Sequence, residues 1–196
     1  MQNKIEILLF FGTFNPIHNG HLALASYFTE FCGIREVWFV ITPQNPFKQN
    51  QILLGNRERQ HLVNLGIGDY PKFRASDIEF NLPKPNYTVN TLAYIGEKFP
   101  DKKFSLLIGG DNLETFHKWK NYKIILENHK LYVYKRPGAI IPNLNDFGNA
   151  DIEIVDAPMM EISSSFIRKA IKEYRDVRYF MPEKVYKYIK DMRYYL

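Results

Sequence analysis

Apolar, β-prone runs alternate with segments of helical periodicity along almost the whole chain, and this order restricts the fold more than any other feature. The apolar runs are continuous, which is typical of strands in a parallel sheet covered on both faces. The repeated strand–helix order predicts an α/β fold: a single Rossmann-like, doubly wound parallel sheet with helices on both faces and a short C-terminal helical segment. The expected strands are 5–11, 36–42, 73–80, 103–110, 130–136 and 152–157, and the expected helices are 20–32, 56–67, 88–99, 163–174 and 182–192.

Length and cysteine content favour one domain in a reducing compartment. The 196 residues predict a single domain, 1–196, whose C-terminal helical part covers about 161–196. One cysteine, Cys32, excludes an intrachain disulfide framework. The first apolar run contains Glu6 and lacks a small-residue cleavage site, so it is interpreted as a strand rather than a signal peptide. With no apolar run near the roughly 18 residues of a membrane span, we expect a cytoplasmic protein without a membrane partner.

The net charge of +5 suggests an anionic partner, which could be nucleic acid, a membrane surface or a phosphorylated small molecule. The basic residues are spread along the chain, so long nucleic acid is not favoured over nucleotides. In doubly wound sheets, ligands bind outside the carboxyl ends of the strands at the topological switch point. The loops after strands 5–11, 36–42 and 103–110 are therefore the places where a site is expected.

The stretch GTFNPIHNGH follows the first expected strand and carries two histidines, His18 and His21. Gly12 can adopt backbone angles denied to other residues, and Gly20 allows a ligand to approach the first helical turn. The helix start offers backbone N–H groups to a phosphate, and histidine can donate hydrogen bonds and carry positive charge. A metal site would need a third ligand, which no nearby residue supplies at a familiar spacing. The alternative is that one histidine simply caps the helix.

A second motif, EISSSFIRKAI (161–171), places three serines at an expected helix start and Arg168 one turn later. Serine is a good N-cap, so Ser163 and the hydroxyls after it make a helix start that suits an anion. The guanidinium of Arg168 can direct two donors onto phosphate oxygens. The alternative interpretation is ordinary capping, with Arg168 in solvent.

Together these motifs resemble a known superfamily. GTFNPIHNGH resembles the H-x-G-H signature of the nucleotidyltransferases, although class I aminoacyl-tRNA synthetases carry a similar element. The second motif resembles the ISSTxxR element of adenylyltransferases, with Ser165 where threonine is usual. Three further segments resemble the bacterial nicotinate-nucleotide adenylyltransferases in the same order along the chain: PNYTVNTL (85–92), LLIGGDNLETFHKWKNY (106–122) and YKRPG (134–138).

This resemblance implies an enzyme that transfers AMP from ATP to nicotinate mononucleotide, forming nicotinate adenine dinucleotide and pyrophosphate in NAD biosynthesis. It implies direct in-line attack, with His18, His21 and Arg168 as catalytic residues and Mg²⁺ bound through the ATP phosphates. The ATP-binding residues that it implies are Gly12, Thr13, Phe14, Gly20, Gly109, Asp111, Ser163, Ser164 and Ser165. The residues that it implies for the mononucleotide are Lys48, Tyr87, Thr88, Trp119 and Arg136.

Each of these assignments has an alternative. Trp119 could be a core residue, Thr88 the N-cap of the third helix and Asp111 a helix cap, while Lys48 and Arg136 could be surface cations. The protein could be a sister nucleotidyltransferase whose acceptor is nicotinamide mononucleotide, pantetheine phosphate or glycerol phosphate. A basic nucleic-acid-binding module would instead show a clustered basic face. The oligomeric state stays open, since the aromatic C-terminal segment could pack on its own core or in a homo-oligomer.

Overall fold

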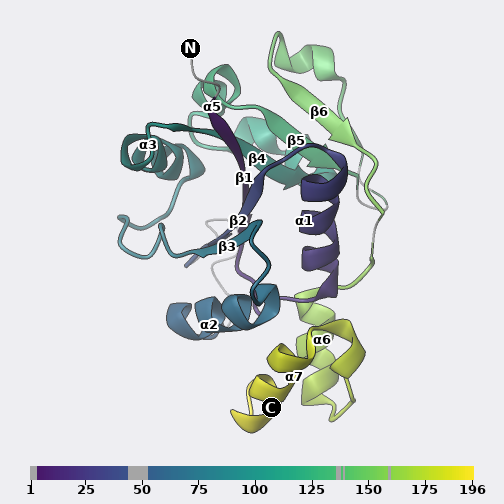
Figure 1. Ribbon diagram of the computed structural model, residues 1–196. Coiled ribbons are helices and arrows are strands. Elements are labelled where there is room, and N and C mark those ends of the chain that lie inside the picture. The colour runs from purple at the N-terminus through teal and green to yellow at the C-terminus, as the bar shows by residue number, and fades with distance from the viewer. Residues whose placement is uncertain (1–3, 44–52, 136–137, 139, 159) are drawn as a thin grey trace.

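Six parallel strands form one sheet in the order β3-β2-β1-β4-β5-β6 (Figure 1). The computed structural model describes residues 4–43, 53–135, 138, 140–158 and 160–196. The strands are β1 Ile5–Gly12, β2 Glu36–Ile41, β3 Phe73–Ser76, β4 Lys102–Gly109, β5 Leu131–Tyr134 and β6 Ile152–Val155. This arrangement confirms the predicted doubly wound parallel sheet.

Helices cover both faces of the sheet, and the last two lie together beside α2 (Figure 1). The α-helices are α1 Asn19–Phe31, α2 Asn56–Ile67, α3 Thr88–Lys98, α4 Gly110–Glu114, α5 Tyr122–Asn128, α6 Ser164–Lys172 and α7 Glu183–Asp191. Three 3₁₀ turns are η1 Phe116–Lys118, η2 Leu144–Phe147 and η3 Arg178–Phe180. Within the described ranges, no helix is both long and apolar enough to cross a membrane.

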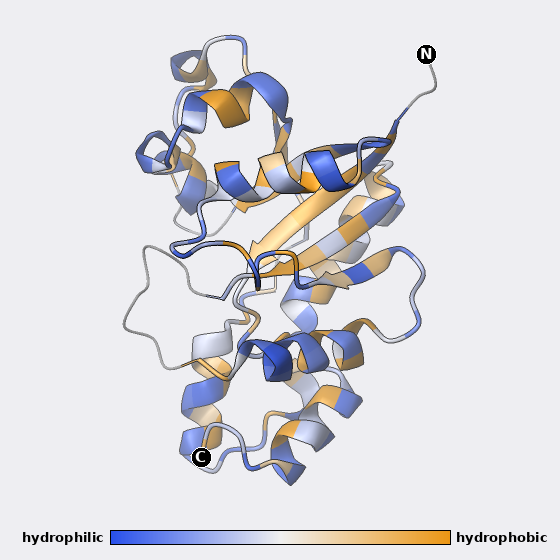
Figure 2. Ribbon diagram, turned by 90° about the vertical axis from the view of Figure 1, so that its left-hand side faces the viewer, coloured by the Kyte–Doolittle hydropathy of each residue, from blue (hydrophilic) through white to orange (hydrophobic). Residues whose placement is uncertain are grey.

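Successive side chains of the central strands pack in two separate hydrophobic cores, one on each face of the sheet. Leu8 and Phe10 of β1 belong to the core shared with α1, α2, α6 and α7, whereas Ile7 and Leu9 belong to the core under α3 and α5. Alternate side chains of a strand point to opposite faces, so a strand buried on both faces must be apolar throughout. Figure 2 shows these hydrophobic strands between helices that carry both kinds of residue.

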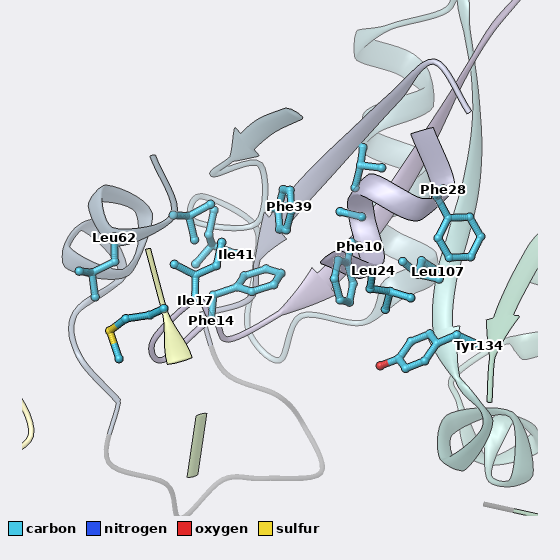
Figure 3. Close-up of a cluster of buried hydrophobic side chains, with 14 of the residues drawn as sticks. Phe10, Phe14, Ile17, Leu24, Phe28, Phe39, Ile41, Leu62, Leu107 and Tyr134 are labelled. Atoms are coloured by element: carbon cyan, nitrogen blue, oxygen red, sulfur yellow. The ribbon is translucent and has the colours of Figure 1, made fainter. Parts of the chain in front are cut away.

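The first core is built around aromatic side chains in register across the sheet. Phe10 stands beside Phe39 on β2 and Leu107 on β4, and Figure 3 shows these three side chains close together. The rings of Phe10 and Phe39 lie 5.7 Å apart between centroids. Aromatic pairs of this kind add about 0.5–1.5 kcal/mol beyond the area that they bury. This packing therefore stabilises the carboxyl ends of β1 and β2, where the chain leaves the sheet.

The structure differs from the predicted secondary structure in several details. The strand expected at 73–80 ends at Ser76, and the chain then turns, with the N–H of Phe80 donating to the carbonyl of Asp77 over 2.9 Å. The turn buries Glu79 against α3, which an extended edge strand would not do. Strand β6 likewise ends two residues before the expected boundary, and the list of expected helices contains neither α4 nor α5.

The order of the strands reverses between β1 and β4. Strands β1, β2 and β3 follow one another toward one edge of the sheet. The next strand, β4, pairs with the opposite side of β1. Both strands end in a glycine, Gly12 in β1 and Gly109 in β4. A ligand site is expected at this crevice, because connections leave it in opposite directions.

Candidate active site

The histidine loop (residues 13–18) connects β1 to α1 at the switch point. A Cβ atom on Gly12 would come within 2.9 Å of Cζ of Phe14, so a larger residue would displace that ring. Phe14 has a positive φ of 43°, a strained conformation for a bulky residue. Its ring is buried and packs edge-on against Phe10 and His21, with centroids 5.6 and 5.1 Å away. Phe14 therefore anchors the loop in the core, and a contact with a nucleotide would have to come from its backbone.

The two histidine rings stack with their centroids 3.6 Å apart and an interplanar angle of 23°. His18 is only 4% exposed, and it is the N-cap residue of α1. One histidine therefore stands at the cap position, as the alternative interpretation expected. Its backbone N–H donates to Nδ1 of His21 over 3.3 Å. Because Nδ1 accepts this bond, a neutral His21 ring carries its proton on Nε2, where it can donate to an anion.

Gly20 lies where the start of α1 approaches the segment before α6. A Cβ atom there would lie 3.1 Å from Nδ1 of His18 and 3.4 Å from the carbonyl oxygen of Met160. The glycine therefore makes room for the chain itself. Its predicted role in admitting a ligand stays a prediction.

Helix α6 brings the second motif onto the histidine loop. Ser163 caps the helix, and its Oγ accepts the N–H of Phe166 over 3.1 Å. The hydroxyl of Ser164 donates to the carbonyl of Pro16 over 2.8 Å, although 148 positions separate the two residues. Two sequence motifs from opposite ends of the chain thus meet at the switch point.

Arg168 is not in solvent, as the alternative interpretation expected. It is half-buried; its Nη1 donates to the carbonyl of Asn15 over 2.8 Å, and its Nη2 donates to Oγ of Ser165 over 3.2 Å. A guanidinium has five N–H donors, and these bonds fix its orientation while engaging only two of them. Arg168 can therefore be held beside the loop and still bind a phosphate.

Arg59 of α2 bonds the loops beside the candidate site, and the sequence analysis did not predict this role. It is fully buried, and burial lowers its pKa to about 10, so it remains charged at neutral pH. Its guanidinium donates to four backbone carbonyls and one side-chain amide oxygen at 2.7–3.3 Å, on Thr13, Thr42, Pro43, Leu54 and Asn56. The only signal in the sequence is that Arg59 falls on the same helical face as Leu62 and Val63, which are buried.

Three of the residues expected to hold the acceptor, Tyr87, Thr88 and Trp119, lie in two segments that a side-chain contact joins. Tyr87 is the N-cap of α3 and Thr88 its first residue, so the alternative role of Thr88 as N-cap is wrong by one position. Trp119 is half-buried against Phe116, with ring centroids 4.8 Å apart. Lys120, which was not predicted, holds its ammonium 4.4 Å from the centroid of the Tyr87 ring. This cation–π contact joins the segment of Trp119 to the start of α3.

Glu79 is a buried carboxyl beneath the start of α3 and was also missed. It is 2% exposed, and its Oε1 accepts the hydroxyl proton of Thr91 over 2.7 Å. Burial raises the pKa of Glu79 to about 7, while hydrogen bonds from Thr91 and Thr42 act in the opposite direction. Its backbone carbonyl accepts Nδ2 of Asn86 over 3.1 Å, which closes the loop that leads to Tyr87.

Of the remaining predicted residues, the structure describes two, and both lie at α4. Gly109 is buried as the N-cap of α4, and Asp111 is exposed in its first turn, at the carboxyl end of β4. Lys48 and Arg136 lie outside the described residues. Among the residues that the structure describes, no three or more His, Cys, Asp or Glu side chains are grouped in a way that could hold a metal ion.

A family comparison covers both motifs. The sequence model of the family described as cytidylyltransferase-like matches residues 9–170. That range begins within β1 and ends within α6, so it contains the histidine loop and the serine-rich helix start.

Curated bacterial proteins match the whole chain. A protein of Christiangramia forsetii is 51% identical over 197 residues, which cover 100% of this chain and 100% of its own length. A protein of Flavobacterium psychrophilum is 50% identical over 191 residues, covering 97% of this chain and 99% of its own. Both carry the name "Probable nicotinate-nucleotide adenylyltransferase".

A solved structure has the same fold. The nicotinic acid mononucleotide adenylyltransferase of Plasmodium falciparum, complexed with NaAD, superposes with a TM-score of 0.80 over 97% of each chain. Its sequence is 19% identical to this one, so the likeness concerns the fold.

Proposed function

The chain belongs to the cytidylyltransferase-like family, among the nicotinate-nucleotide adenylyltransferases, and from this membership we propose that it transfers AMP from ATP to nicotinate mononucleotide. The products are nicotinate adenine dinucleotide, a precursor of NAD, and pyrophosphate. One structural observation carries the proposal: Ser164 and Arg168 of α6 bond directly to the histidine loop at the switch point. These contacts support the proposal, because they bring together the two motifs that we propose to bind phosphate.

In the proposed reaction, an oxygen of the 5′-phosphate of the mononucleotide attacks the α-phosphorus of ATP. A new P–O bond forms, the bond from the α-phosphorus to the bridging oxygen breaks, and pyrophosphate leaves with that electron pair. The attacking phosphate is already ionised at neutral pH, so no protein nucleophile is needed. Catalysis then depends on positioning and charge stabilisation, and good positioning alone can lower such a barrier by roughly 7–11 kcal/mol.

His18 and His21 are the proposed contacts to the α- and β-phosphate oxygens, where negative charge increases in the transition state. The stacked rings and the bond from His18 N–H to His21 Nδ1 support this role, because they fix the direction of the His21 Nε2 proton. Arg168 and the start of α6 are proposed to neutralise the departing pyrophosphate. Gly12, Thr13 and Phe14 are proposed to line the nucleotide with backbone groups.

Mg²⁺ is proposed to bind with ATP. This ion keeps several of its waters and is commonly bound through the phosphates of a substrate. When bound, the ion neutralises charge on the triphosphate.

On the acceptor side, the Trp119 ring is proposed to stack against the flat nicotinate ring, and Tyr87 and Thr88 to offer backbone donors to its carboxylate. The contact between Lys120 and Tyr87 supports this grouping, because it brings the two segments to one place. Asp111 is proposed to accept hydrogen bonds from ribose hydroxyls. Lys48 and Arg136 stay proposals for substrate phosphate, as does a cytoplasmic location.

Pyrophosphate release by the purified protein tests this function. The assay contains ATP and Mg²⁺ and offers nicotinate mononucleotide, nicotinamide mononucleotide or pantetheine phosphate in parallel. We expect strong release with the nicotinate compound.

The His21→Ala variant should release pyrophosphate at least about 100-fold more slowly, since removing one donor to a developing charge costs about that much. His61→Ala is the matched control, because His61 is exposed on α2 and packs on Tyr188.

Release with another acceptor alone would keep the phosphate chemistry and replace the proposed substrate. An active His21→Ala enzyme would refute the role of that histidine. No release with any acceptor would contradict the proposed function.

A further inference from the structure

The end of the chain is bonded to the histidine loop. The hydroxyl of Tyr195, the penultimate residue, lies 2.8 Å from Oδ1 of Asn15, although the two residues are 180 positions apart. Asn15 is fully buried in the middle of the histidine loop. Its Oδ1 also accepts the backbone N–H of Leu54 over 3.3 Å, and its carbonyl accepts Nη1 of Arg168 over 2.8 Å. Asn15 therefore joins the loop to three distant segments.

The chemistry of these contacts fixes the direction of the tyrosine bond. The backbone N–H of Leu54 can only donate, so the atom of Asn15 that faces it must be the amide oxygen. Tyr195 approaches the same oxygen and must therefore donate its hydroxyl proton. Burial raises the pKa of Tyr195, so the hydroxyl keeps that proton at neutral pH, while Arg168 and Arg59 act in the opposite direction.

We propose that Tyr195 is a positioning residue for the reaction: through Asn15, it holds the histidine loop in the geometry that presents His18 and His21 to the phosphates of ATP. This inference rests on the proposed function. Asn15 lies three residues before His18, and the bonds on both its side chain and its carbonyl limit how the loop can move. Small displacements of a positioning group carry large costs, since a shift of about 1 Å can lower a rate roughly 100-fold.

The hydroxyl is the part of Tyr195 that this role requires. A phenylalanine would keep the ring in its place beside Tyr194, where the centroids are 6.3 Å apart, and would lose only the bond to Asn15. The lost donor would leave Oδ1 of a buried amide with one bond fewer, which loosens the loop without opening the core. Tyr195→Phe therefore separates positioning from packing.

The experiment compares Tyr195→Phe with Tyr194→Phe, its matched control. Tyr194 is half-buried one position earlier, and its hydroxyl interacts with Tyr188 rather than with Asn15. For each protein we would measure kcat and both KM values by pyrophosphate release, ATP affinity by calorimetry without acceptor, and the thermal midpoint. For Tyr195→Phe we expect kcat to fall about tenfold and ATP to bind about threefold more weakly, with the mononucleotide KM unchanged within about twofold. Tyr194→Phe should keep the wild-type values.

Equal kcat and ATP affinity in the two variants would overturn the proposal. So would a lower thermal midpoint for Tyr195→Phe with both quantities unchanged at 25 °C, because that result describes a purely structural bond. If the wild-type protein released no pyrophosphate with any acceptor, the proposed function would fail. The ATP affinities of the two variants would then decide by themselves whether Tyr195 positions the loop.

Discussion

Glu79 shows how burial changes the behaviour of a single carboxyl group. Its side chain lies under α3 with Thr91 as its hydrogen-bond donor, and burial raises its pKa from 4.5 to about 7. Between these pH values the folded chain binds a proton that the unfolded chain has released. The stabilisation from this group is therefore fully present below about pH 4.5 and is lost as the pH rises through about 7.

Glu79→Gln should remove this dependence, because glutamine keeps the shape of the side chain and cannot ionise. Each pKa unit corresponds to about 1.4 kcal/mol, so the free energy of unfolding of the wild type should fall by about 3 kcal/mol relative to the variant between pH 4 and pH 8. Urea unfolding across this range measures the difference. Glu97→Gln, an exposed position on α3, should track the wild type. Parallel pH curves for wild type and Glu79→Gln would show that folding does not shift the pKa of Glu79.

At this scale, the positions of residues in local motifs could be predicted, whereas contacts between residues far apart in the sequence could not. His18, His21 and Ser163 occupy a turn and a helix start, where spacing of a few positions determines geometry. Arg59 and Tyr195 reach partners 46 and 180 positions away, and nothing near them in the sequence marks those partners. A buried arginine or tyrosine resembles a surface residue until the fold is known.

Helix α2 is more than a cover for the sheet, because its Arg59 side chain bonds the loops that follow β1 and β2. One guanidinium nitrogen donates to the carbonyls of Thr13 and Thr42 over 2.7 and 2.9 Å. A lysine at position 59 would keep the charge but could not reach all five acceptors, since an ammonium has three donors and no planar fork. Buried acceptors without partners cost about 1–3 kcal/mol each.

We therefore expect Arg59→Lys to lower the free energy of unfolding by about 2–5 kcal/mol and to lower the rate of pyrophosphate release. Urea unfolding and the release assay measure the two effects. Arg57→Lys on the same helix is the control, because Arg57 is exposed and pairs with Asp77 at the surface. A stability equal to that of Arg57→Lys would mean that water or a neighbouring group replaces the missing donors.

Long elements were predicted better than short ones for a physical reason. Strand β1 and helix α1 each bury several residues at the right period, so their patterns are strong. Helix α5 has seven residues, of which only Ile125 is buried, and it begins after Asn121 in a left-handed conformation with a φ of 52°. One buried position defines no period, so a sequence pattern cannot reveal such a helix.

The strand order is a property of the whole molecule, and the alternation of strands and helices indicates a parallel sheet without fixing that order. The order determines where β1 and β4 lie side by side, and it brings Ser164 and Arg168 onto the histidine loop from the other end of the chain. The resemblance of the two motifs to one superfamily predicted that they act together. The contacts that unite them, through Asn15 and Pro16, became apparent only in the structure.

The whole chain is also expected to unfold as one unit, which tests the proposed single domain. Residues of the last two helices, including Ile167 and Val185, belong to the same core as the sheet residue Phe10. Gly66 allows α2 to approach α7 and the histidine loop closely. A Cβ atom at this position would lie 3.0 Å from Ile17 and 3.5 Å from Val185. A core shared in this way couples the C-terminal helices to the sheet.

Two probes can test this coupling, because they report on different parts of the molecule. The tryptophans, Trp38 and Trp119, lie in or against the core under α3 and α5, on the face of the sheet away from α6 and α7. Circular dichroism reports on all helices, including the last two. We expect both signals to change in a single urea transition with the same midpoint. A loss of helical signal before any change in fluorescence would mean that α6 and α7 detach first, and the C-terminal part would then be a separate unit that docks on the histidine loop.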